Sequence, residues 1–272
     1  MRRLGRLLAA AVLLAACGGQ PAAGGPPSPS AAAASPSAPA GAGTCAERVL
    51  GRMTEDQRVG QLFLLGLTAN RLDPAETDAI RALHVGSVWF VDSSPAGVAA
   101  IRAVADSVQA LASGPATGGA RFFVAANQEG GQIQALRGPG FSAIPSALAQ
   151  GGLDPAALQS SAAGWGRELV AAGVNLDFAP VMDVVPPGTD AQNQPVGVLQ
   201  REYGHDPQTA GSHGAAFLRG MGQAGVATTV KHFPGLGRVQ GNTDFAAGVV
   251  DRTTTPDDAS LQSFRQDRKS VV

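Results

Sequence analysis

Short apolar runs alternate with helix-type patterns from about residue 46 onward. The apolar runs are nearly continuous rather than alternating with polar residues, which is typical of parallel strands covered on both faces. The sequence therefore predicts a parallel sheet built from βα units. The five predicted strands are Gln61–Leu67, Val85–Val91, Arg121–Ala126, Val174–Val184 and Val226–His232.

Helical periodicity fills the intervals between these runs. Between residues 96 and 113, apolar residues recur at near-helical spacing from Val98 to Leu111. Pro155 is placed where a first helical turn tolerates a residue without an N–H. The predicted helices are Glu47–Gly60, Pro74–Leu83, Ala96–Ser113, Pro155–Ala172, Gln208–Ala224 and Thr253–Arg265.

Polar residues gather just after the predicted strands, at Asp92, Asn127, Asp183 and the pair Lys231-His232. In a (β/α) barrel, the C-terminal ends of the strands form the active-site face. The alternative is a doubly wound open sheet, which usually carries a glycine-rich phosphate loop, and no such loop follows a predicted strand here. We therefore expect an α/β fold of the (β/α)8 TIM-barrel type, with about five βα units present.

Residues 1–17 predict an export signal. Three arginines precede the apolar run Leu7–Ala16, which is too short to span a bilayer. The run leads into LAAC, ending in Cys17, which is similar to the lipobox of bacterial lipoproteins. That similarity implies a lipid on Cys17 and an exported protein, anchored to the bacterial cell membrane and facing the cell wall. An ordinary secretory signal with a chance cysteine is the alternative.

The next segment, residues 18–45, predicts a disordered tether to a folded domain at 46–272. Up to residue 43 it consists almost entirely of Pro, Ala, Gly and Ser. Without large apolar side chains, burial does not offset the entropy lost on ordering. Cys45 is the one cysteine besides Cys17, and it is either a buried, inert thiol or half of a disulfide.

Charge and ligand chemistry limit the partners. A net charge of −1 gives no electrostatic footprint for nucleic acid. The histidines at 84, 205, 213 and 232 show no zinc-type spacing with other ligands. We therefore expect no metal and no other cofactor.

Five sequence blocks occur in order along the predicted domain. Together they resemble the family 3 glycoside hydrolases, particularly bacterial β-N-acetylglucosaminidases that act on peptidoglycan fragments. The resemblance implies a barrel, a retaining mechanism with two carboxylates, and β-N-acetylglucosaminides of cell-wall origin as substrates. The blocks are MT…VGQL (Met53–Leu62), NQEGG with IQ and Leu136 (127–136), GREL…NLDFAPVMDV (Gly166–Val184), REYG with DP (201–207) and KHFPGLG (Lys231–Gly237).

The resemblance also assigns roles to residues. Lys231 and His232 match sugar-hydroxyl donors, with a structural pair as the alternative. Arg201 matches a substrate contact, or else forms a surface salt bridge. Asp183 either contacts substrate or braces a loop. Asn127 stands where the family usually has an Asp that binds sugar hydroxyls, so it keeps the size but loses the charge.

Two further departures concern catalysis. The family's Asp-x-His acid/base dyad aligns with Asn242 and Asp244. Asp244 is the candidate acid/base if burial raises its pKa, and otherwise a turn residue. Gln132 and Ala135 replace two family arginines, which points to an altered ligand preference.

The nucleophile is expected to be an Asp at the end of a later strand, and no such segment is found in this chain. LQSFR, residues 261–265, is similar to a family helix that leads into the remaining strands. We therefore expect a truncated barrel without its nucleophile. The favoured interpretation is that the protein is a glycoside hydrolase. The alternatives are a non-catalytic saccharide-binding envelope lipoprotein and an inactive fragment.

Overall fold

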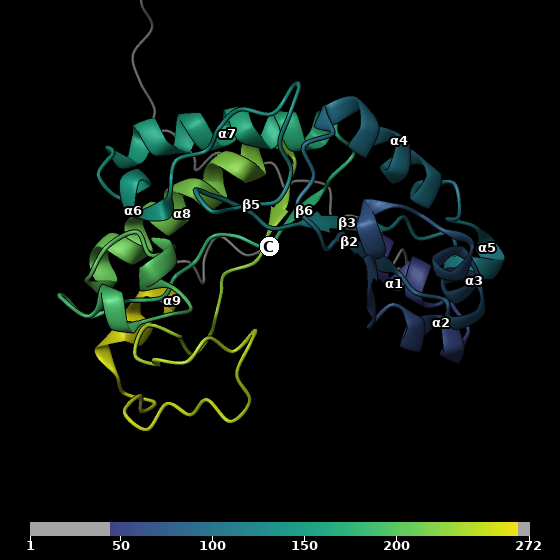
Figure 1. Ribbon diagram of the computed structural model, residues 1–272. Coiled ribbons are helices and arrows are strands. Elements are labelled where there is room, and N and C mark those ends of the chain that lie inside the picture. Colours follow the sequence, from purple (N-terminus) through teal and green to yellow (C-terminus); the bar gives the residue numbers. More distant parts are fainter. Residues whose placement is uncertain (1–43, 266–272) are drawn as a thin grey trace, which may run out of the picture. The chain divides into compact units, whose positions relative to one another are not determined.

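The computed structural model describes residues 44–265, which belong to one compact unit (Figure 1). The leader 1–17 with Cys17, the tether up to residue 43 and the tail 266–272 lie outside the described residues. The expectations placed on them stay predictions.

Cys45 begins the first helix instead of closing the tether. Its thiol is exposed and free, so a buried thiol is the wrong alternative. Within 44–265, no helix is long and apolar enough to cross a membrane.

Five parallel strands form one sheet whose spatial order follows the chain order. The register aligns Leu64 with Ser87, and Ser87 with Phe123. Sequential parallel pairing of this kind is the start of a (β/α) barrel, and β1 and β7 are the two edges of the sheet in the described residues. The strands are β1 (Leu64–Leu67), β2 (Ser87–Phe90), β3 (Phe123–Ala126), β6 (Leu176–Asp177) and β7 (Ala227–Thr228).

All five predicted strands exist, but the last two are much shorter than predicted. Pairing between β6 and β7 ends at Asp177 and Thr228. Pro180 follows closely and has no N–H to donate to a neighbouring strand. One bridge, between Val181 and Lys231, continues the pairing beyond that point. The residues after Thr228 are therefore positioned by the sheet without being part of a strand.

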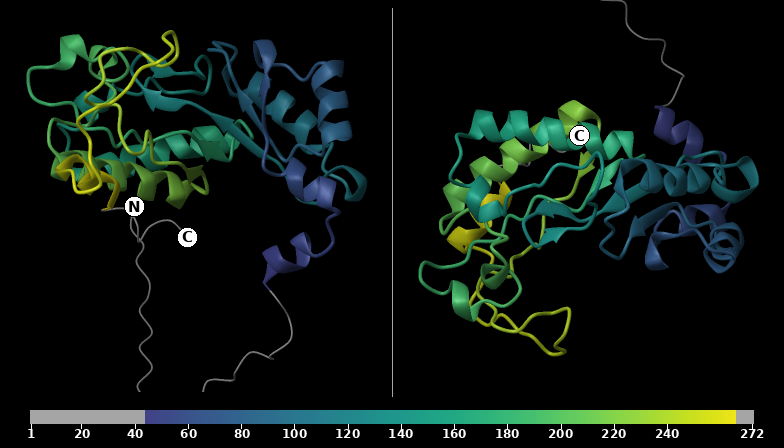
Figure 2. Two further views of the ribbon diagram at one scale, coloured as in Figure 1. Left: turned by 90° about the horizontal axis from the view of Figure 1, so that it is seen from below. Right: turned by 45° about the horizontal axis from the view of Figure 1, so that its top comes forward.

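The long helices α3 (Pro74–Leu83), α4 (Gly97–Gln109), α7 (Pro155–Ala171) and α8 (Pro207–Ala224) confirm the predicted ones, with small changes at their ends. Proline opens both α7 and α8, and an aspartate caps each. Asp154 accepts from the N–H groups of Ala156 and Ala157, and Asp206 accepts from Thr209. Figures 1 and 2 show α7 and α8 side by side, in contact along their length.

Two predicted helices were wrong in extent. The segment from 47 to 60 is split, because Thr54 leaves the helix and caps the next one in a capping box with Gln57. Residues 232–258 contain no helix or strand and form the long loop in yellow-green in Figure 1. Only the end of the predicted Thr253–Arg265 helix forms.

The remaining elements are α1 (Cys45–Leu50), α2 (Glu55–Gly60), η1 (Thr68–Asn70), α5 (Gly114–Thr117), β4 (Gln128–Gly130), β5 (Ile133–Gln134), α6 (Ala147–Gln150), η2 (Asp190–Gln192), η3 (Gly197–Leu199), η4 (Ala259–Leu261) and α9 (Gln262–Arg265).

The main core lies between the sheet and its helices. Phe90 and Val124 from the strands are fully buried and belong to the same cluster as Ile101, Leu169 and Phe217 from α4, α7 and α8. A smaller cluster of three valines packs against Leu236. This second cluster fixes the loop that follows β7, and that loop supplies part of the pocket described next.

Candidate active site

A pocket of about 570 Å³ lies at the C-terminal ends of the strands, where the sequence predicts an active site. Asn127 directly follows β3, and Lys231 and His232 follow β7. Arg201 reaches the same pocket from the segment after η3. The structure therefore brings together four of the residues chosen from the sequence, and Asp244 also lines the pocket.

Beneath the pocket, the buried carboxylate of Glu129 holds the two cations in place. Its Oε2 accepts from Nε of Arg201 at 2.9 Å, and its Oε1 accepts from Nη2 at 2.8 Å. Nζ of Lys231 lies 2.5 Å from the same Oε1. Glu129 was part of a motif in the sequence analysis but not one of its site residues. Its need for charged partners follows from burial in β4, which the structure shows and the sequence does not.

Electrostatics keep this carboxylate ionised. Burial alone would raise the pKa of Glu129. The hydrogen bonds and positive charges of Arg201 and Lys231 outweigh burial and hold that pKa below its usual value. The one carboxylate thus pairs with both cations and fixes them at the floor of the pocket, which keeps a net positive charge.

Asn127 takes part in the same network. Nζ of Lys231 donates to Oδ1 of Asn127 at 2.9 Å. An ammonium group has three donors, and Asn127 and Glu129 occupy two of them. Within residues 44–265, one N–H of Lys231 has no partner, and Lys231 lines the pocket.

His232 connects Arg201 to Asp183. Its Nδ1 lies 2.6 Å from Oδ2 of Asp183, and its Nε2 lies 3.1 Å from Nη2 of Arg201. A guanidinium group only donates, so Nε2 accepts and Nδ1 carries the proton that it donates to Asp183. In this arrangement, His232 positions Arg201, and its ring nitrogens are already engaged instead of being available to a sugar hydroxyl.

Asp183 is fully buried. Besides the ring of His232, its Oδ1 accepts from the backbone N–H groups of His232 and Leu236. All of these donors come from the loop after β7. The contacts fit the loop-bracing alternative that the sequence left open for this residue.

Arg201 has further partners that fix its direction. Its Nη1 donates to the carbonyl oxygen of Pro195 at 2.7 Å. With Glu129 and His232 also bound, four of the five guanidinium N–H groups have partners among the described residues. The remaining N–H group is available to a ligand.

Asp244 lines the pocket from the long loop, and its carboxylate is close enough to contribute to the raised pKa of Arg201. The side chain is exposed. Its backbone N–H donates to Oδ1 of Asn242 at 2.9 Å, as in a turn. The burial required for an acid role is therefore not met in this conformation, while the turn geometry of the alternative is present.

A second buried carboxyl lies close to this network. Asp177, the last residue of β6, has no exposed surface. One oxygen accepts from the N–H of Gln128 at 2.9 Å, and the other has no partner in the described part of the chain. Burial raises its pKa to about 7 against the lowering effect of Lys231. Sequence analysis did not identify it, because a single Asp within an apolar run carries no mark of function.

Apolar groups form another part of the pocket wall. Trp89 and Phe178 pack edge to face, with ring centroids 5.9 Å apart, and both line the pocket. Trp89 is partly exposed. The pocket thus presents an aromatic surface near a set of fixed cationic donors.

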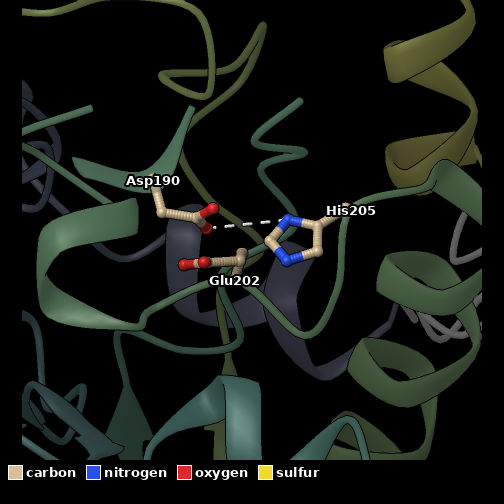
Figure 3. A group of neighbouring side chains, drawn as sticks. All are labelled: Asp190, Glu202 and His205. Carbon is tan, nitrogen blue, oxygen red and sulfur yellow. Dashed lines mark ion pairs between the residues drawn. The ribbon is translucent and has the colours of Figure 1, made fainter. Parts of the chain in front are cut away.

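A separate group of titratable side chains lies outside the pocket lining. Figure 3 shows the carboxyl group of Asp190 turned toward the ring of His205, with the side chain of Glu202 beside them. One ligand atom from each lies within 4.8 Å of the others. Among residues 44–265, this is the group whose chemistry and spacing could hold a metal ion.

Comparison with known proteins places these features in a family. Residues 54–267 match the model of the "Glycosyl hydrolase family 3 N terminal domain". The "Beta-hexosaminidase" of Vibrio cholerae is 36% identical over 142 residues, which is 52% of this chain and 41% of that protein. The one from Pseudomonas aeruginosa is 36% identical over 148 residues, which is 53% of this chain and 40% of that protein.

Similar proteins of known structure include enzymes of the same family. The beta-N-acetylhexosaminidase of Beutenbergia cavernae is 52% identical with a TM-score of 0.79, covering 81% of this chain and 65% of that one. A family 3 beta-N-acetylglucosaminidase from Paenibacillus is 27% identical with a TM-score of 0.69, covering 81% and 41%. The match spans about two fifths of the length of the curated relatives.

Proposed function

Because the chain belongs to glycosyl hydrolase family 3, we propose that the protein hydrolyses β-linked N-acetylhexosaminides, with N-acetylglucosaminides of cell-wall origin as the substrate class. The observation that supports this best is the pocket floor, where Glu129 fixes Arg201 and Lys231 with one free donor each. The relatives named β-hexosaminidases support the reaction class.

The pocket suits a sugar ring. A pyranose presents hydroxyl groups around its edge and C–H groups on its faces. The free N–H groups of Arg201 and Lys231 suit the hydroxyl edge, and the ring of Trp89 suits an apolar face. Because the cations are already held by Glu129, little side-chain entropy is lost when a sugar binds.

The proposed reaction is retaining. A carboxylate attacks the anomeric carbon and forms a covalent bond to it, while a carboxylic acid gives its proton to the oxygen of the leaving group. The former acid, now a carboxylate, then takes a proton from water; the water oxygen bonds to the anomeric carbon, the bond to the first carboxylate breaks, and the sugar is released. In this proposal Asp244 takes the acid/base role. Because its side chain is exposed in this structure, that role requires the loop to bury the carboxyl group when the sugar binds. A retaining mechanism needs a second carboxylate as its nucleophile, and Asp244 is the only acidic residue in the pocket lining formed by residues 44–265.

That same observation favours a second candidate function. A pocket with fixed cations and a single acidic lining residue can bind a saccharide without cleaving it. Under this alternative, the protein is a saccharide-binding envelope protein, and Asp244 is a turn residue.

Two measurements on the whole chain separate these functions. Calorimetry with N-acetylglucosamine is expected to show binding that Lys231→Met abolishes, because a donor is lost. Release of the aryl group from an aryl N-acetyl-β-glucosaminide is then followed. Binding with release supports the hydrolase, and binding without release supports the second function. Absence of binding contradicts both.

We further propose that the protein is exported and anchored through lipid on Cys17, facing the cell wall. The basic leader, the short apolar run and the LAAC sequence support this. Mass spectrometry of the N-terminal peptide from the native host is expected to find a lipidated Cys17. Unmodified Cys17 contradicts the anchor and leaves the hydrolase proposal intact.

A further inference from the structure

The cluster of Asp190, Glu202 and His205 is unusual for its buried member. Glu202 has no exposed surface, and neither of its carboxylate oxygens has a hydrogen-bond partner among the described residues. Oδ1 of Asp190 is likewise buried and lacks a hydrogen bond. Leaving buried carboxylate oxygens without a partner is costly. The arrangement therefore calls for a positively charged ligand or a shared proton.

His205 provides the nitrogen expected of a metal ligand. Its Nδ1 lies 3.1 Å from the carbonyl oxygen of Val185 and 3.7 Å from Oδ1 of Asp190. Figure 3 shows the ring edge that carries both nitrogens turned toward the two carboxylates. An imidazole can bind a metal through either ring nitrogen. Nδ1 is the nitrogen measured near Asp190, and a ring that instead keeps the contact of Nδ1 with Val185 has the lone pair of Nε2 for the metal.

We propose that Asp190, Glu202 and His205 bind one divalent cation of the zinc class, and that this ion ties η2 to the segment that carries Arg201. Two carboxylates balance the charge of the ion, and the imidazole completes three protein ligands, with water in the fourth position. Ligand atoms around zinc lie about 3.3 Å apart, so small side-chain rotations bring the three groups into range. Asp190 and His205 are about one-third exposed, which leaves a path for entry.

The ligand set selects among cations. Calcium prefers six to eight oxygen ligands, and magnesium keeps most of its waters. An imidazole with two carboxylates suits zinc, and manganese more weakly. Glu202 is next to Arg201 in the chain, so the ion would hold the backbone from which the guanidinium reaches the pocket. This gives the cation a positioning role in sugar binding and no part in bond cleavage.

The test is titration of the chelator-treated whole chain with zinc chloride by calorimetry. One ion per chain is expected, and the binding is expected to persist in excess magnesium. Glu202→Gln and His205→Gln are each expected to weaken it by at least about 100-fold. His84→Gln is the matched control, because His84 also points Nδ1 at a backbone carbonyl, that of Ala116, and is expected to leave zinc affinity unchanged.

The melting temperature is a second measurement, and it distinguishes a variant that has lost the zinc site from one that has failed to fold. With zinc at a hundredfold excess over its dissociation constant, the melting temperature of the parent chain is expected to rise by about 5–10 °C. His205→Gln, a change at a side chain that is about one-third exposed, is expected to lose that rise while keeping the metal-free melting temperature.

Two results overturn the proposal. The first is a parent chain that does not bind zinc, in which case an infrared band from a protonated Glu202 points to a proton shared with Asp190. The second is zinc affinity that survives both Glu202→Gln and His205→Gln; if Asp183→Asn then loses the affinity, the ion lies on the pair Asp183–His232.

Discussion

Glu129 and Arg201 form a two-point ion pair beneath the pocket, with N···O distances of 2.8 and 2.9 Å and side chains that are 4% and 11% exposed. The geometry matches the planar fork of a guanidinium to the two oxygens of a carboxylate. Because Lys231 contacts the same carboxylate, a single negative charge is shared between two positive ones, and the group of three keeps a net charge of +1. Several of the predictions below test this arrangement.

Replacing Glu129 with Gln is expected to destabilise the fold. The change leaves Arg201 and Lys231 close together without their shared counter-charge, and breaking a buried ion pair costs about 3–5 kcal/mol. Urea unfolding measures the loss. Glu55→Gln, on the exposed start of α2, is the control and is expected to change stability by less than about 0.5 kcal/mol. Equal effects of the two substitutions would contradict the role of Glu129.

Replacing Arg201 with Lys is expected to weaken N-acetylglucosamine binding by about 10- to 100-fold. Lysine keeps the charge but cannot reproduce the two-point contact with Glu129 and the bonds to Pro195 and His232. Calorimetry measures the affinity. Arg71→Lys, at an exposed ion pair with Asp73, is the matched control and should bind as the parent does. An Arg201→Lys variant with parental affinity contradicts the positioning argument.

Replacing Asp183 with Asn is expected to disturb the proton on His232. An amide can accept through only one atom, while Asp183 accepts from the ring with one oxygen and from two backbone N–H groups with the other. Nitrogen-15 NMR is expected to show the parent ring protonated at Nδ1, with that state lost in the variant. Sugar affinity is expected to fall by about tenfold, since a hydrogen bond contributes about 1 kcal/mol or more. An unchanged ring spectrum would argue against the assigned tautomer.

The stability of the fold is expected to decline as pH rises from about 4 to 7 because of Asp177. Its pKa in the folded chain, about 7, is above the ordinary value of 3.8, so the folded state binds the extra proton in this window. The contribution is complete below the unfolded pKa and is lost as pH rises through the folded pKa. It amounts to about 4 kcal/mol at most.

Urea unfolding from pH 5 to pH 8 checks this. Asp177→Asn keeps the oxygen that accepts from Gln128 and removes the titration, so its stability is expected to fall less steeply with pH than that of the parent. The pKa of Glu202 is also raised, to about 8, mainly by burial, and it adds the same slope to both proteins. Parallel pH profiles in parent and variant would rule out Asp177 as the source.

Replacing Asp244 with Asn tests the acid/base assignment in protein that hydrolyses the aryl glycoside. The rate is expected to fall by about 10²- to 10⁴-fold. The loss should be larger for a disaccharide than for an aryl glycoside, because a poor leaving group needs the proton more. Asp257→Asn, an exposed change on the same loop, should retain the parental rate. An unchanged rate on both substrates ends the assignment.

Much of the fold could be predicted because local signals agree with it. Pro74–Leu83 has the predicted bounds, with Asp73 at the N-cap and Pro74 at the first helical position. The segment 47–60 was harder, since the capping box of Thr54 competes with apolar periodicity across a gap of a few residues. The end of β6 at Asp177 could not be predicted, because a strand ends where its backbone groups stop pairing with the adjacent strand. The sequence of one segment does not show which groups of another segment it pairs with.

Some residues of the candidate site could be predicted from the sequence and others could not. Residues directly after strands, such as Asn127 and Lys231, were predictable because parallel strands bring their C-terminal ends to one side. Glu129 was missed because its importance comes from burial. Asp190, Glu202 and His205 were beyond prediction, since they meet through loops whose path no periodicity specifies.

The pocket is formed by residues that are far apart in the chain, so it exists only in chains that have folded. Lys231 bonds to Asn127 across 104 positions of the chain, and Arg201 to Glu129 across 72. Contacts between such distant residues carry a high loop-closure cost and form only after the intervening segments are ordered. The number of saccharide-binding sites measured per chain is therefore expected to report the fraction of chains that have completed this long-range assembly, and a bound sugar is expected to protect that assembled state from unfolding.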